Sequence, residues 1–78
     1  MLLFSRHARL RMLERNIKED LVIKTIENPD NLIIENNQYI AAKQFDKSVL
    51  LVIYSKTDNI EFVVTVIFSS KMAKYLNR

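Results

Sequence analysis

The sequence predicts a single α+β domain over residues 1–78, in which a strand and a two-helix hairpin precede an antiparallel β-meander. Two observations predict this class. Up to Glu27 the apolar residues recur at helical spacing, whereas from Leu32 onward Ile, Val, Tyr and Phe accumulate and short polar pairs interrupt them. About half of the 78 residues are apolar, which favours one small folded domain over disorder.

The first half is expected to contain a short strand at residues 2–4 and two helices. The stretch 5–17 begins with Ser5, a good N-cap, and lacks Pro, Gly and β-branched residues before Ile17, which predicts a helix of roughly three turns. Asn16 should make a turn, because Asn tolerates left-handed backbone angles. A second helix is expected over 19–28 and should stop before Pro29, since proline disfavours helical geometry in the preceding residue.

The second half should form four strands, at residues 32–35, 39–45, 49–54 and 60–68. The connections at 36–37, 46–47 and 57–59 contain Asn, Asp, Lys and Thr. Because the chain has no glycine, Asn and Asp must supply the unusual turn conformations. The last two strands are apolar on both faces, so both are expected inside the sheet.

One face of this sheet is expected to lack a helical cover. Two helices can cover only one face, and the other should present Val63 and Ile67, or whichever set of alternating residues points outward. This face could be covered by a partner protein, by self-association, or by the segment 69–78 folding back. We expect a partner or self-association.

Several classes of function are excluded by composition. Without cysteine there are no disulfides or thiolate metal sites, and one histidine makes a zinc site improbable. Without glycine there is neither a P-loop nor a dinucleotide fingerprint, so no cofactor is expected. The apolar runs are too short for a membrane helix, and the start has no basic region typical of a signal peptide. A cytoplasmic protein without membrane association is therefore expected.

Charge is distributed unevenly along a chain of net charge +3. Residues 1–18 carry a net +4 and residues 70–78 a net +3, so the middle carries −4. This arrangement is expected if the two ends meet in one basic surface that faces phosphate. The alternative interpretation is that these are ordinary solubilising charges.

The segment 5–17 holds the only histidine and four of the five arginines. At about 100° per residue, Leu10, Leu13 and Ile17 fall on one side of the helix, and Ala8 and Met12 fall on another. His7, Arg11, Glu14 and Arg15 lie between these patches and are expected to be partly buried.

Metal-independent RNA cleavage fits this set of side chains. Attack of the 2′-hydroxyl on the adjacent phosphorus needs a proton acceptor, cations for the phosphate charge and a donor for the leaving 5′-oxygen. His7 is the candidate acceptor, Arg11 and Arg15 the phosphate clamp, and Lys71 and Tyr75 a second cation and a proton donor or stacking ring. The further cations expected to bind nucleic acid are Arg6, Arg9, Lys74 and Arg78.

Each of these residues also has a structural interpretation. A lone histidine in a first helical turn is more often a hydrogen-bonded structural residue, and Glu14 can pair with Arg11 or Lys18 at helical spacing. Tyr75 and Leu76 can close the core, and Lys43 can be merely solvated. The alternative functions are accordingly a non-catalytic nucleic-acid-binding module and a protein-interaction domain.

The string Ser5-x-His7-Ala8-x-x-Arg11-Met12-x-x-Arg15-x-Ile17 resembles the opening signature of a family of small prokaryotic domains of unknown function. Asn16 stands where that family usually has glycine. The family in turn resembles RelE- and BrnT-type toxins, which share a strand, two helices and an antiparallel sheet. This second resemblance implies a RelE-like fold, metal-independent ribonuclease activity on RNA, in some cases ribosome-bound mRNA, and an antitoxin partner. The segment 70–75 is similar in character to their basic C-terminal segments.

Overall fold

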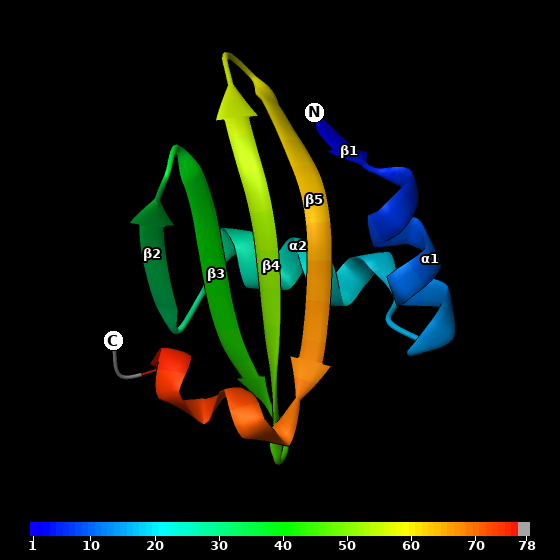
Figure 1. Ribbon diagram of the computed structural model, residues 1–78, viewed down its shortest axis with the longest axis vertical. Helices are drawn as coiled ribbons and strands as arrows, with labels where there is room; N and C mark the ends of the chain where they lie inside the picture. Colours follow the sequence, from blue (N-terminus) through cyan, green and yellow to red (C-terminus); the bar gives the residue numbers. More distant parts are fainter. Residues whose placement is uncertain (77–78) are drawn as a thin grey trace.

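The structure is a computed structural model that describes residues 1–76, apart from the side chains of residues 72–74. It contains two α-helices, five strands and a terminal 3₁₀ helix, confirming the predicted α+β class (Figure 1). In chain order these elements are β1 (Leu2–Phe4), α1 (Arg6–Glu14), α2 (Glu19–Glu27), β2 (Asn31–Glu35), β3 (Gln38–Phe45), β4 (Ser48–Thr57), β5 (Ile60–Ser69) and η1 (Ser70–Leu76).

The five strands form one mixed sheet in the order β1-β5-β4-β3-β2. Strands β2 to β5 are the predicted antiparallel meander, and β1 adds to it parallel to β5, with Leu3 opposite Phe62. Both β4 and β5 therefore have a neighbour on each side, as their two apolar faces predicted. The start of the chain is held by the amide of Glu61, which donates to the carbonyl of Met1 at 2.9 Å.

Turns in this chain are made by Asn and Asp. Among the described residues, positive φ occurs at Asn16, Asn36, Asn37, Asp46 and Asp58, where φ lies between 51° and 64°. Asn36 and Asn37 both have positive φ, as a two-residue type I′ hairpin loop requires. The prediction that Asn and Asp replace glycine in the turns is therefore confirmed.

The main core lies between the helices and one face of the sheet. Helix α2 crosses behind the sheet and α1 stands beside β5 (Figure 1). Both helices have nine residues, and no helix of the described chain is long and apolar enough to cross a membrane. The buried side chains of this core are Ala8, Met12, Ile17, Val22, Ala41, Leu50, Val52, Tyr54, Val63 and Val66.

A β-bulge in β5 changes which residues face this core. Ile53 pairs with Thr65 but Tyr54 pairs with Val63, so Val64 is an extra residue in the ladder. Val63 and Val66 consequently point to the same, helix-covered face and are both buried. The expectation that Val63 lies with Ile67 on the second face is wrong, because simple alternation does not hold across a bulge.

The second face is covered in part by η1. A smaller cluster of Ala42, Val49 and Leu51 is buried there, with Tyr75 and Leu76 packed against it. The side-chain amide of Asn31 donates to the carbonyl of Tyr75 at 2.7 Å, so the end of η1 lies beside β2. The C-terminal segment therefore folds back, but Phe62 and Ile67 on the same face remain 38% exposed.

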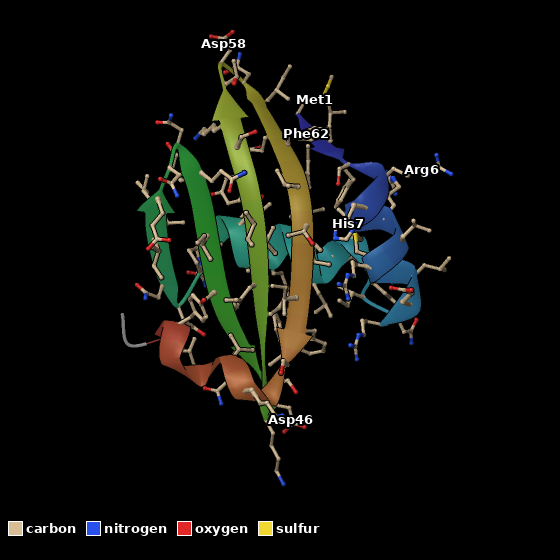
Figure 2. All side chains as sticks on the ribbon, viewed as in Figure 1. Met1, Arg6, His7, Asp46, Asp58 and Phe62 are labelled. Carbon is tan, nitrogen blue, oxygen red and sulfur yellow. The ribbon has the colours of Figure 1, made fainter. Side chains whose placement is uncertain are left out.

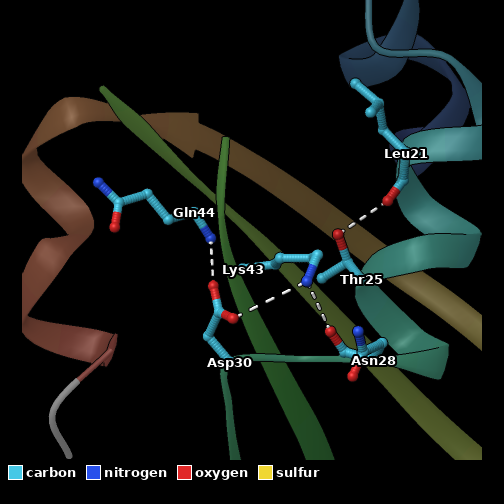
Figure 3. A network of polar contacts seen from close by, with 6 residues as sticks. All are labelled: Leu21, Thr25, Asn28, Asp30, Lys43 and Gln44. Carbon is cyan, nitrogen blue, oxygen red and sulfur yellow. Dashed lines mark hydrogen bonds and ion pairs between the residues drawn. The ribbon is translucent and has the colours of Figure 1, made fainter. Parts of the chain in front are cut away.

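The connection between α2 and β2 is fixed by a polar network (Figure 3). Lys43 of β3 donates to the carbonyl of Asn28 at 2.9 Å and pairs with Asp30 at 3.8 Å. Asp30 also accepts a 2.8 Å hydrogen bond from the amide of Gln44, and the buried Thr25 donates to the carbonyl of Leu21. Lys43 is thus not merely solvated, because the end of α2 and the following turn offer it two oxygen partners.

Candidate nucleic-acid interface

The first turn of α1 is anchored to the sheet by Ser5. Its hydroxyl oxygen accepts a hydrogen bond from the amide of Ala8 at 2.9 Å and donates to the carbonyl of Val64 at 2.6 Å. The amide of Ser5 donates to the carbonyl of Val63 at 2.9 Å. The predicted N-cap is confirmed, and it places His7 in the first turn of a helix whose origin is fixed on β5.

The end of α1 is equally well defined. Arg15 is the C-cap, Asn16 adopts a φ of 55°, and the amide of Ile17 donates to the carbonyl of Met12 at 2.8 Å. A left-handed residue followed by a buried apolar one is the usual way to close a helix and return the chain to the core. Arg15 therefore stands at the end of the helix, just past Glu14.

All four residues of the stripe, His7, Arg11, Glu14 and Arg15, are exposed, so the expectation of partial burial is wrong. Helix α1 packs only through Ala8 and Met12, at the edge of the sheet. The other predicted patch is divided, because Ile17 is buried in the core whereas Leu10 and Leu13 are 53% and 80% exposed. The stripe is therefore a solvent-facing surface, on the helix that Figure 2 marks with Arg6 and His7.

A shallow hollow on this surface is lined by His7, Leu10, Arg11 and Glu14. These residues share one side of the helix because they are three or four positions apart. Within the described chain, none of these side chains forms a hydrogen bond or an ion pair. An imidazole, a guanidinium and a carboxylate thus face solvent in one open depression.

Arg9 contacts charged and aromatic side chains of the described chain, unlike the other arginines at α1. Its guanidinium lies 4.7 Å from the centre of the Phe4 ring and 3.1 Å from a carboxylate oxygen of Glu19. Both partners of the ion pair are more than half exposed, so the pair adds little stability. Arg6, Arg11 and Arg15 form no ion pair with a described residue and keep their charge available.

The structure does not bring Tyr75 to His7. Tyr75 lies beside β2, whereas α1 packs against β5 near the other edge of the sheet (Figure 1). Lys71 is exposed at the start of η1, after β5 has ended. The predicted approach of Tyr75 to His7 is wrong, because η1 runs across the sheet to fill the second core.

Two of the predicted cations lie beyond the part of the chain that the structure describes. They are the side chain of Lys74 and all of Arg78. Among the described residues, no group of three or more His, Asp or Glu side chains is placed to hold a metal ion.

A feature that the sequence did not reveal is an aromatic pair above α2. The rings of Tyr39 and Tyr54 stack with centroids 5.2 Å apart, on cross-strand neighbours of β3 and β4. Burial raises the pKa of the Tyr54 hydroxyl, and the negative charge of Glu61 raises it further. A hollow of about 270 Å³ nearby is lined by Leu2, Ile23, Ile26, Glu27 and Glu61.

The chain belongs to the family described as a domain of unknown function (DUF4258), whose model matches residues 4–68. That range begins at Phe4, the last residue of β1, includes all of α1, and stops one residue before the end of β5. No curated protein and no solved structure is significantly similar to the chain.

Proposed function

We propose that this family member is a toxin-like RNA-binding protein that acts on RNA in the cytoplasm through the exposed surface of α1. The observation that carries the proposal is the hollow in which His7, Arg11 and Glu14 share solvent access. Support comes from the resemblance to RelE- and BrnT-type toxins, which implies RNA as the substrate and an antitoxin-like protein as the regulator.

Phosphate binding is favoured because three arginines at α1 are exposed and unpaired with a described carboxylate. Arg6, Arg11 and Arg15 are exposed and have no carboxylate partner among the described residues, so no internal ion pair must break when RNA binds. A guanidinium can hold two phosphate oxygens at once, which an ammonium cannot. Arg11 and Arg15 are four positions apart, so they lie about one turn from each other on the same side of α1 and can contact the same strand.

We further propose that the bound strand is cleaved without a metal ion. The 2′-oxygen attacks phosphorus and His7 accepts its proton, while Arg11 stabilises the added negative charge. The bond from phosphorus to the 5′-oxygen then breaks, and the imidazolium returns the proton to that oxygen. The products are a 2′,3′-cyclic phosphate and a free 5′-hydroxyl, so atoms and charge balance.

The proposed chemistry relies on α1 alone. Tyr75 packs beside β2 and cannot supply the proton donor from that position, and Lys71 follows the end of β5. Because His7 is exposed and not held by a hydrogen bond, its positioning must come from the bound RNA. We therefore expect slow cleavage, with binding as the stronger activity.

Binding is tested by fluorescence anisotropy with a labelled single-stranded RNA over a range of salt concentrations. The slope of log affinity against log salt should fall by about 0.7 for each phosphate that a variant no longer neutralises. Arg11→Ala should lower both affinity and slope. Lys47→Ala removes an exposed cation from the β3–β4 hairpin and should change neither. Equal effects of the two substitutions would contradict a specific α1 surface.

Cleavage is tested by incubating the protein with RNA in excess chelator and identifying the ends of the products. Wild-type protein should produce 2′,3′-cyclic phosphate ends, and His7→Ala should abolish them while RNA binding is kept. Products that persist in His7→Ala would contradict the role of the imidazole. Binding without any products would favour the non-catalytic nucleic-acid-binding module.

A further inference from the structure

The face of the sheet away from α2 carries almost no charge. Successive strand residues point to opposite faces, so the cross-strand pairs assign each residue to one of them. Among the strand residues, all of which are described, Glu35 is the single charged one on this face. The helix-covered face, in contrast, includes Lys43, Lys56 and Glu61.

Part of this face is open to solvent. Leu3, Ile60, Phe62 and Ile67 are 42%, 40%, 38% and 38% exposed, and Ile53 beside them is half-buried. These five residues make up the open patch. Leu3 lies opposite Phe62 across β1 and β5, and Ile53 of β4 lies opposite Thr65, the neighbour of Ile67 on this face of β5. The uncharged polar residues Ser55 and Thr65 therefore complete the surface between the apolar side chains.

The C-terminal helix runs away from the open patch. It covers Ala42, Val49 and Leu51 and ends beside Asn31 of β2, at the far edge of the sheet from β1. The patch is therefore bounded by η1 on one side and by α1, which stands next to β5, on the other (Figure 1).

The lack of charge on the open patch indicates what kind of surface can bind to it. It offers neither a cation for phosphate nor a charge for a basic or acidic peptide, and four of its five side chains are aliphatic. Bases stack best on several aromatic rings, and the patch has only Phe62. The complementary surface is therefore another uncharged aliphatic one.

We propose that the open patch binds the open patch of a second copy of this chain. In a twofold dimer each copy contributes the same surface to the interface. An uncharged apolar surface can pack against itself in this way, whereas a surface with charges of one sign would repel itself. Two sheets can pack face to face about 10 Å apart. The cations of α1 then lie at the rim, where solvent and salt screen their repulsion.

The predicted dimer is weak. Five residues are far fewer than the roughly 20 to 30 residues a side of a stable interface. Assembly should therefore depend on protein concentration, and it should strengthen with salt, because each copy has a net charge of +3. RNA binding through α1 should weaken with salt, so the two interactions are distinguishable.

Sedimentation equilibrium over a wide range of protein concentration tests the proposal. The mass should rise from the 9.2 kDa monomer toward twice that value. Phe62→Lys and Ile67→Lys should each weaken the dimer at least tenfold. Ile34→Lys is the matched control, because Ile34 is a β-strand residue that is 64% exposed on the helix-covered face. It should leave the dimer unchanged.

Several outcomes would overturn the proposal. These are a monomer at every concentration and salt level, or dissociation by Ile34→Lys but not by Phe62→Lys. If a charged variant fails to fold by circular dichroism, Phe62→Ala takes its place, and it should also weaken the dimer. Loss of RNA affinity in Phe62→Leu, with the mass unchanged, would instead identify the patch as a base-stacking surface.

Discussion

At the scale of single residues, the sequence predicted conformation better than exposure. The need for Asn and Asp at left-handed positions followed from the lack of glycine, and all five positive-φ residues of the described chain are Asn or Asp. The exposure of His7 and Arg11 did not follow, because the pattern of α1 shows two apolar patches. Only the packing of α1 at a sheet edge decides which patch is buried.

Asn16 provides a test of the left-handed turn. Glycine adopts this conformation without the steric cost that a Cβ imposes, which is about 1 kcal/mol for ordinary residues. Asn16→Ala should therefore lower the free energy of unfolding by about 1 kcal/mol, and Asn16→Gly should equal or exceed the wild type. Urea denaturation measures both. A stable Asn16→Ala variant would show that this turn is not needed to end α1.

Tyr54 should give the protein a stability that depends on alkaline pH. Burial and Glu61 raise the pKa of its hydroxyl in the folded state, so the unfolded chain loses this proton at lower pH than the folded chain. The stabilisation is complete below the ordinary tyrosine pKa of about 10 and is lost as pH rises above it. Tyr54→Phe should flatten the fall in unfolding free energy above that pH.

Tyr39→Phe is the control for Tyr54→Phe, since it alters the other ring of the same stack. Chemical denaturation at a series of alkaline pH values gives the free energies for all three proteins. An equally steep fall in wild type and Tyr54→Phe would show that other groups control the alkaline transition.

At the scale of elements, the helix and strand order could be predicted, but their contacts could not. Hydrophobic period and turn residues placed β2 to β5 and both helices close to their observed bounds, and β1 was expected only as a short strand before the first helix. The bulge at Val64 and the partners of Lys43 depend on how neighbouring strands and connections meet, which no local pattern encodes.

Lys43 should stabilise the junction of α2 and β2. Its ammonium donates to the carbonyl of Asn28, where the helix dipole is negative, and only 20% of its side chain is exposed. Lys43→Met keeps the length of the chain but removes the charge, and should lower the free energy of unfolding by about 1 kcal/mol. Lys47→Met, on the exposed β3–β4 hairpin, should have almost no effect. Similar values for both would contradict a stabilising junction.

At the scale of the whole molecule, the residues of η1 that stabilise the fold lie apart from the residues of α1 that carry the proposed chemistry. The expectation that Tyr75 joins His7 in one site failed because Tyr75 and Leu76 pack over Ala42, Val49 and Leu51. Charge alone indicated that the ends should converge, but burial of apolar residues determines where η1 lies. The candidate site is thereby reduced to the surface of α1.

Substitution of Tyr75 should therefore affect stability but not RNA binding, and substitution of His7 should affect cleavage but not stability. Tyr75→Ala should lower the free energy of unfolding by about 2 kcal/mol, because it uncovers the second cluster, and should leave RNA affinity at temperatures below unfolding unchanged. His7→Ala should change stability by less than about 0.5 kcal/mol, because His7 is exposed, yet remove cleavage. Denaturation and RNA assays on the same preparations measure both properties. Loss of cleavage in a folded Tyr75→Ala variant would mean that Tyr75 reaches α1 during the reaction. The proposal that α1 alone forms the site would then be wrong.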